Sequence, residues 1–386
     1  MKRLFILLTA ILLSACASVA PPPAAYLFQD QLFSPPGAGV GDAGPIFALT
    51  PEMQRYADAV VHGEDKRDRQ AALFDALYKK DKLQLEYDSA ITRTAAQTFA
   101  ARRGNCLSLV IMTAALARAM DMSVQYQSVS VEETWSRSGS LYFASGHVNL
   151  VLGKNRFDDG RTYDRNKYMI IDFQPPEETK NMVTLQIEEK TVIAMFMNNR
   201  AAEALARHEL DDAYWWAKQA IAHDPAFVNT YNTLGIVYQH HGNLVQAESA
   251  LRYAYARQPD STIAMFNLAQ VLESQGRSSE AAALKAQLAR LEPNPPFYYF
   301  NLGRQAMQEG DYQKARSLFA RELERSPYYH EFHFWMAVAA FNLGDLKTAD
   351  KHMKLALENS ATRGDHDLYA AKLDRLKSYE RKRATN

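Results

Sequence analysis

The chain has 386 residues, of which 47% are hydrophobic and 23% charged, the composition of an ordinary globular protein. One hydrophobic core rarely serves a chain of this length, so we expect two domains. Lysine plus arginine and aspartate plus glutamate are equal at 44 each, so the sequence lacks the basic excess that is typical of a nucleic-acid-binding protein.

Residues 1–16 have the pattern of a secretory signal peptide. A basic start precedes the apolar run 4–13, which is too short to span a bilayer as a helix. The four residues Leu13-Ser14-Ala15-Cys16 resemble the lipobox of bacterial lipoproteins. The resemblance implies cleavage before Cys16 and attachment of acyl chains such as palmitate, which would anchor the protein in the membrane. Because Ala17 rather than Asp follows the anchor, the family's sorting habit implies the outer membrane, facing the periplasm.

The segment 17–49 is rich in Pro, Gly and Ala, a composition that predicts an extended tether between the membrane and the folded body. It contains one apolar patch, Tyr26-Leu27-Phe28 with Leu32-Phe33, which is a candidate for docking on that body.

Residues 50–185 are predicted to form an α+β domain with helices first and an antiparallel sheet after them. Thr50-Pro51-Glu52 is typical of a helix start, because a capping residue precedes a proline at the first helical position. Apolar residues then recur at helical spacing, and after residue 120 the pattern changes to the alternation of strands, with glycines between them. The predicted helices are 65–79 and 106–120, and the predicted strands are 124–129, 147–152 and 168–173.

Residues 194–361 repeat with a fixed period of 34. Small residues, glycine and proline return at the same places in each period, where they let two helices approach and end them. This period and pattern are similar to those of tetratricopeptide repeats, which implies an all-α solenoid of helix pairs that binds a protein or peptide partner. We expect five repeats, followed by a capping helix and tail in 362–386. The repeats begin near Ala194, Val228, Thr262, Pro296 and His330, and the recurring residues include Gly242, Gly276, Gly310 and Gly344, with Pro225, Pro259, Pro293 and Pro327.

Cys106 is a candidate nucleophile. It lies at the predicted start of an apolar helix, where backbone N–H groups and the helix dipole favour a thiolate and can stabilise an oxyanion. His147 opens one predicted strand and Asp172 lies near the end of another. If those strands are neighbours packed on the helix, the three side chains converge, and His147 could take the thiol proton while Asp172 orients the imidazole.

Three short motifs resemble the transglutaminase-like superfamily of papain-related cysteine enzymes. They are Arg103-Gly104-Asn105-Cys106-Leu107-Ser108-Leu109, Gly146-His147-Val148-Asn149-Leu150 and Ile170-Ile171-Asp172-Phe173. The resemblance implies a catalytic Cys106, His147 and Asp172 that hydrolyse or transfer an amide acyl group without a cofactor. Asn105 and Leu107 depart from the Gln-Cys-Trp of the animal crosslinking enzymes, and the match is closer to bacterial proteins that join such a domain to tetratricopeptide repeats.

Several phenylalanines fall where first-helix side chains of such repeats usually line the concave groove, so we expect them to bind a partner. Helix packing is the alternative role for these residues. No ligand set for a metal accompanies the histidine pair His240-His241, and we expect no metal. The predicted partner-binding residues are Phe266, Phe297, Phe300, Phe334 and Phe341.

Two functions remain open from the sequence. In the first, the protein is a lipid-anchored thiol enzyme whose repeats recruit its substrate. In the second, it is a non-catalytic adaptor that organises an envelope complex, and the α+β domain is a degenerate enzyme. The first requires Cys106 to be partly exposed and within reach of His147. The second predicts that Cys106 is buried or that a local segment such as 131–141 fills the cleft.

Overall fold

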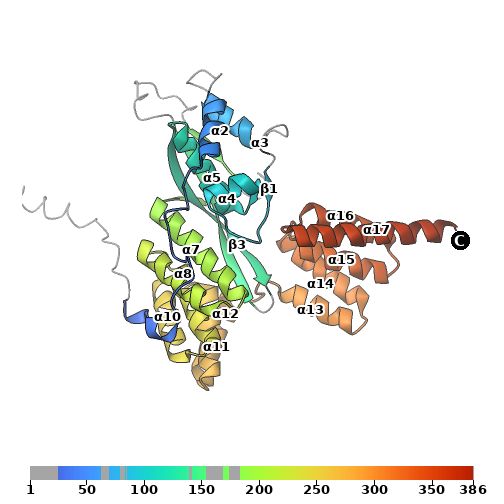
Figure 1. Ribbon diagram of the computed structural model, residues 1–386. Helices are drawn as coiled ribbons and strands as arrows, with labels where there is room; N and C mark the ends of the chain where they lie inside the picture. The colour runs from blue at the N-terminus through green and yellow to red at the C-terminus, as the bar shows by residue number, and fades with distance from the viewer. Residues whose placement is uncertain are drawn as a thin grey trace, which may run out of the picture. The chain divides into compact units, whose positions relative to one another are not determined.

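The computed structural model describes residues 25–61, 69–78, 83, 85–138, 141–153, 168–173 and 183–385 (Figure 1). The predicted signal peptide and Cys16 lie outside these residues. The chain forms two compact units, which are described separately. One consists of the N-terminal segment up to Gly41 together with Ile193–Gln275, and the other of Asp42–Val192 together with Gly276–Asn386.

Helices come first in the mixed α/β region, and local capping signals explain where they begin. The hydroxyl of Thr50 accepts a hydrogen bond from the Met53 backbone N–H, 3.2 Å away, at the start of the first helix. Thr94 and Gln97 form a reciprocal capping box before a later one. The helices are α2 (Pro51–Val61), α3 (Arg69–Tyr78), α4 (Ala95–Ala101) and α5 (Cys106–Ala119).

A four-stranded antiparallel sheet follows, with the strand order β5-β4-β3-β6. The predicted antiparallel sheet is thus confirmed, and α5 packs on its central strands β3 and β4. Every residue of α5 from Leu107 to Ala117 is buried, so the helix is fixed on all sides. A separate parallel pair joins Glu86–Tyr87 (β1) to Arg103–Gly104 (β2). The strands of the larger sheet are β3 (Ser123–Ser138), β4 (Leu141–Gly153), β5 (Tyr168–Ile171) and β6 (Val183–Ile187).

From Glu189 onward the described chain is helical. The unit boundary at Gln275 and Gly276 falls inside the third predicted repeat. The helices before the boundary are α7 (Glu189–Ala206), α8 (Leu210–His223), α9 (Asn229–His240), α10 (Leu244–Arg257) and α11 (Thr262–Ser274). Those after it are α12 (Ser278–Leu291), α13 (Tyr298–Gln308), α14 (Tyr312–Arg325), α15 (His330–Asn342), α16 (Leu346–Glu358) and α17 (Arg363–Thr385).

The backbone conformation explains why glycine recurs at one position in every repeat after the first. Each of these glycines lies in the turn between two helices with a positive φ, between 77° and 88°, where side chains are strained. His208 stands at the equivalent position of the first repeat and adopts the same left-handed conformation, with φ of 61°. The first helix pair therefore keeps the turn geometry without the residue that favours it. The glycines are Gly242, Gly276, Gly310 and Gly344.

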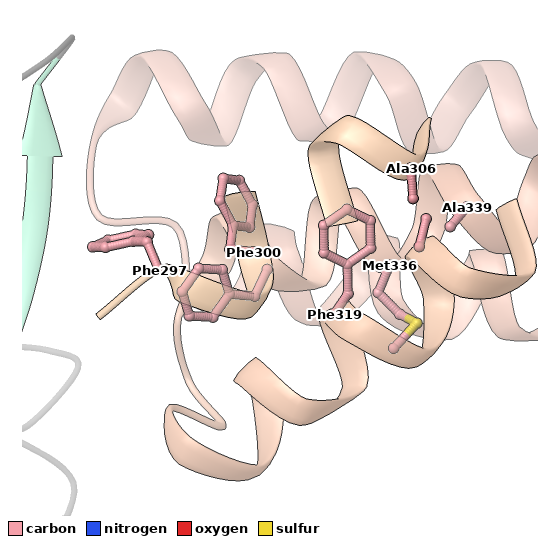
Figure 2. Packing of buried hydrophobic residues seen from close by; sticks show 8 residues of the cluster. Phe297, Phe300, Ala306, Phe319, Met336 and Ala339 are labelled. Atoms are coloured by element: carbon pink, nitrogen blue, oxygen red, sulfur yellow. The ribbon is translucent and has the colours of Figure 1, made fainter. Parts of the chain in front are cut away.

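A different glycine sets how closely α13 and α14 approach. A Cβ atom built on Gly303 would lie 2.5 Å from Cε1 of Phe319, far inside van der Waals contact. Phe319 belongs to a buried cluster that also contains Phe300 and Met336 (Figure 2). The aromatic ring occupies the space that the missing side chain leaves.

We therefore expect Gly303→Ala to destabilise the helices α13–α17 by about 1–3 kcal/mol, because overpacking outweighs the better helix propensity of alanine. Thermal and denaturant unfolding measure the effect. Gly364→Ala is the matched control, since its nearest neighbour would be the Thr362 hydroxyl at 3.8 Å. Equal stability of the two variants would show that α13 and α14 can separate without cost.

Candidate functional site

A hydrogen-bonded loop fixes the start of α5. The side-chain oxygen of Asn105 accepts from the backbone N–H of Ser108 at 2.9 Å and from its hydroxyl at 2.8 Å, while its amide donates to the Thr92 hydroxyl at 2.8 Å. The Arg93 backbone N–H donates to the Ser108 hydroxyl at 2.8 Å. Gly104 leaves room for this arrangement, because a Cβ there would lie 2.7 Å from Cβ of Ser108. The sequence Gly104-Asn105 thus holds the next residue in one place.

That next residue is Cys106, the first residue of α5. Its side chain is a free thiol that is neither fully buried nor fully exposed. The thiol lies at the positive end of a 14-residue helix, an environment that favours a negative charge on sulfur.

The sheet brings His147 and Asp172 together. Leu150 of β4 pairs with Ile171 of β5, so the residue after β5 comes next to the middle of β4. Nε2 of His147 lies 2.6 Å from Oδ1 of Asp172. The His147 side chain is buried and that of Asp172 is 17% exposed. An imidazole held in this way by a carboxylate has a fixed orientation and a fixed tautomer.

Two further side chains hold Asp172 in place. The amide of Asn149 donates to Oδ2 of Asp172 at 3.0 Å. The hydroxyl of Tyr78, from α3, donates to the backbone carbonyl of Asp172 at 2.6 Å, and its ring stacks on Phe173. Neither residue was predicted from the sequence to belong to the site. The usable signal for Asn149 is its position two residues after His147, which places both on one face of the strand. No sequence signal links Tyr78 to this site.

The pKa of His147 depends on both Asp172 and Cys106. Burial lowers the pKa of the ring, but the hydrogen bond to Asp172 and the interaction with Cys106 outweigh it and raise the pKa to about 9. Nδ1 of His147 is buried and has no hydrogen-bond partner among the described residues. The ring thus engages the carboxylate through Nε2, and its other nitrogen remains available to the thiol.

Comparison with known protein families identifies the helix pairs. The sequence pattern described as "Tetratricopeptide repeat" matches residues 232–296 and 300–363. These helix pairs are tetratricopeptide repeats. Such repeats form surfaces that bind other proteins, so the repeat region is suited to a protein partner. No curated protein is significantly similar to the chain.

Several solved structures resemble the tetratricopeptide repeat region. The crystal structure of MamA protein is 22% identical and covers 45% of this chain and 93% of its own, with a TM-score of 0.25. The structure of YrrB, described as a TPR protein with an unusual peptide-binding site, is 20% identical. It covers 47% of this chain and 92% of its own, with a TM-score of 0.25. PilF of Pseudomonas aeruginosa is 18% identical and covers 52% of this chain and 100% of its own, with a TM-score of 0.28.

The predicted aromatic groove of the tetratricopeptide repeats needs a correction at two positions. Phe297 is 2% exposed and Phe300 fully buried, so neither is available to a ligand (Figure 2). The reason is local, because Phe297 precedes α13 in a left-handed conformation and its ring contacts Phe332 and Tyr329. These two rings are packing residues. Phe266 and Phe334 are half-buried, whereas Phe341 is 40% exposed and lies against Tyr379.

The described residues contain no candidate for a membrane-spanning helix or a metal site. None of the helices there is both long and apolar enough to cross a bilayer. Within the same part of the chain, no group of three or more His, Cys, Asp or Glu side chains is placed to hold a metal ion.

Proposed function

We propose that this protein is a lipid-anchored thiol enzyme of the transglutaminase-like type, which hydrolyses or transfers an amide acyl group of a protein or peptide that its tetratricopeptide repeats recruit. The observation that carries the proposal is the 2.6 Å contact of His147 Nε2 with the Asp172 carboxylate, supported by the interaction with Cys106 that contributes to the raised pKa of the ring. The motifs around Cys106, His147 and Asp172 give the same assignment from the sequence.

In the proposed reaction, the proton of the Cys106 thiol passes to His147, and the sulfur attacks the amide carbonyl to give a tetrahedral intermediate that collapses to a thioester. The C–N bond breaks, and the amine leaves with a proton from His147. Water or a second amine then attacks the thioester, gives a proton to His147 and regenerates the thiol. The free backbone N–H groups at the start of α5 can stabilise the oxyanion of each tetrahedral intermediate. Asp172 keeps the imidazole oriented and stabilises its charge.

The pKa of His147 tests the coupling between the ring and the thiol. Cys106 contributes to the raised pKa, so the pKa of about 9 should fall in Cys106→Ala. Histidine-selective NMR titration measures it, with His147→Gln to assign the resonance. An unchanged pKa in Cys106→Ala would mean that the ring does not sense the thiol, and the proposed pair would be wrong.

The lipid anchor belongs to the same proposal, and the chain offers a matched control because it has only two cysteines, Cys16 and Cys106. In a bacterial host, the wild-type protein should incorporate labelled palmitate and Cys16→Ala should not, while Cys106→Ala should keep the label. Label in Cys16→Ala, or none in the wild-type protein, would contradict the anchor.

The adaptor function is a second candidate, and the tetratricopeptide repeats favour it directly because they are a protein-binding architecture. It holds whether or not Cys106 turns over a substrate. Cys106→Ala separates the two functions, since the variant should retain partner binding and lose any acyl transfer or hydrolysis.

A further inference from the structure

The described part of the N-terminal segment, residues 25–41, belongs to the same compact unit as the first tetratricopeptide repeats. Two short 3₁₀ turns, Ala25–Leu27 and Asp30–Leu32, lie within it, and the first of them contacts α10 (Figure 1). The segment packs on helices α8 and α9 through one aromatic side chain, one carboxylate and a series of backbone hydrogen bonds.

The aromatic contact is made by Phe33, which is buried. Its ring stacks on that of Tyr214, with centroids 4.0 Å apart and planes 6° from parallel. The rings of Tyr238 and His241 complete the site, at centroid distances of 5.7 and 4.6 Å. A phenylalanine side chain in such a site removes a large apolar area from water.

The carboxylate of Asp30 is held by two groups of α8. The hydroxyl of Tyr214 donates to Oδ1 at 2.5 Å, and the ammonium of Lys218 lies 2.6 Å from Oδ2. Asp30 itself remains half exposed. The site therefore recognises a negative charge three residues before an aromatic ring.

The remaining contacts recognise the main chain of the segment, which a peptide of another sequence could offer in the same conformation. The hydroxyl of Tyr238 donates to the carbonyl of Leu27 at 2.7 Å, and burial raises the pKa of this phenol to about 12. The hydroxyl of Tyr214 also accepts from the Gln29 N–H at 2.9 Å. On α8, Asp211 and Asp212 each accept a backbone N–H at 2.9 Å, from Ser34 and Gly37, and the indole of Trp215 donates to the Ser34 carbonyl at 2.7 Å.

The other repeats show that these residues are not needed to build a helix pair. At the equivalent positions of the later repeats, Tyr214 is replaced by Glu248, Ala282, Arg316 and Asp350. Trp215 is replaced by Ser249, Ala283, Ser317 and Lys351, and Tyr238 by Leu272, Ala306 and Ala340. The aromatic groups of α8 are therefore not required by the repeat, whereas Tyr238 of α9 stands where tyrosine is usual in tetratricopeptide repeats.

We propose that this face of α8 and α9, built from Tyr214, Lys218 and Tyr238, is a peptide-binding site that residues 27–37 of the same chain occupy as an internal ligand. Its external ligands are peptide segments that carry a carboxylate three residues before an aromatic side chain and adopt the same turn between them. The site differs from the groove lined by the first helices of the repeats, because the second helix α8 supplies most of its contacts. It is independent of the thiol chemistry proposed above.

The covalent link decides which ligand is bound. A segment tied to its site acts at an effective concentration in the millimolar range, so an external peptide of the same sequence cannot displace it at micromolar concentration. A substitution in the internal segment that weakens its binding lets an external peptide compete for the site, and the residues of the site itself are unchanged.

The test uses a fluorescently labelled peptide of residues 25–41 and the full chain. The peptide should bind the Phe33→Ala chain at least about 10-fold more tightly than the wild-type chain, because only the variant site is open. A peptide with both Asp30→Ala and Phe33→Ala should not bind. Adding Lys218→Ala to the Phe33→Ala chain should weaken binding of the labelled peptide, since the Lys218 ammonium pairs with the ligand carboxylate and lies over the Phe28 ring of the segment.

Asp30→Ala in the full chain is a second way to open the site, and it is safe for folding because the side chain is half exposed. It replaces Phe33→Ala if circular dichroism shows that the latter is unfolded. Equal binding to wild-type and opened chains, no binding to an opened and folded chain, or equal binding of the peptide that lacks both side chains would each overturn the proposal.

Discussion

Replacing His147 by alanine is expected to slow the alkylation of Cys106 by iodoacetamide at pH 7 by about 10- to 100-fold, because the variant loses the imidazole that activates the sulfur. The imidazole, with its pKa raised to about 9, is protonated at pH 7 and places a positive charge beside the sulfur. Alanine removes that charge from the site. The measurement uses the full chain with Cys16→Ser, so that Cys106 is its only thiol.

The control is His366→Ala, which removes a histidine whose side chain is 56% exposed. Both variants should react at the same rate in denaturant, where the site no longer exists. If native His147→Ala reacts as fast as His366→Ala, Cys106 is not paired with His147 and the adaptor function is the one that remains.

The pH dependence follows from the direction of the His147 shift. Because the pKa in the folded protein is about 9, above the ordinary value of 6.5, the protonated ring stabilises the fold. This contribution is fully present below pH 6.5 and is lost as the pH rises through about 9. The difference in alkylation rate between wild type and His147→Ala should shrink over the same upper range.

The second large effect is expected at a buried carboxylate among the later tetratricopeptide repeats. Glu322 of α14 is 2% exposed, and its Oε1 accepts from the backbone N–H of Tyr299 at 2.8 Å and of Phe300 at 3.3 Å. These groups belong to the first turn of α13, whose N-cap residue Phe297 supplies no side-chain cap. A side chain from the neighbouring helix thus caps α13.

Glu322→Ala is therefore expected to destabilise this part of the chain by about 2–3 kcal/mol, because it leaves buried N–H groups without a charged acceptor. Denaturant unfolding measures the loss, and hydrogen exchange at Tyr299 and Phe300 should accelerate. Glu324→Ala, an exposed position on the same helix, is the control and should change stability by less than about 0.5 kcal/mol. Equal effects would show that water replaces the carboxylate.

The sequence predicted the features that depend on interactions between residues close together in the chain. Glycine at a left-handed turn returns in every repeat but the first. Alternation predicted the strand that carries His147, but placed this residue at the strand's start, whereas β4 begins at Leu141 and His147 lies within it. The apolar run predicted a helix that starts at Cys106, and the structure has it. These signals are local, so one sequence is enough to read them.

Other features depend on tertiary contacts and left no readable pattern. Phe297 stands where a groove residue is expected, but its backbone conformation turns the ring inward. Strand β6 consists mostly of exposed residues, so it lacks the alternation of a half-buried strand. The sequence showed an apolar patch around Phe33, but only the fold reveals that Tyr214 and Tyr238 lie next to it.

The packing of the N-terminal segment on α8 and α9 limits the distance between the folded protein and the bilayer. If Cys16 carries the acyl chains, the residues between it and the seated part are 17–24, which reach at most about 30 Å when fully extended. With the segment released, the free chain runs to Asp42 and reaches about 90 Å. A peptide that displaces the whole segment up to Gly41 would thus lengthen the connection threefold. The protein could then contact partners that are farther from the membrane.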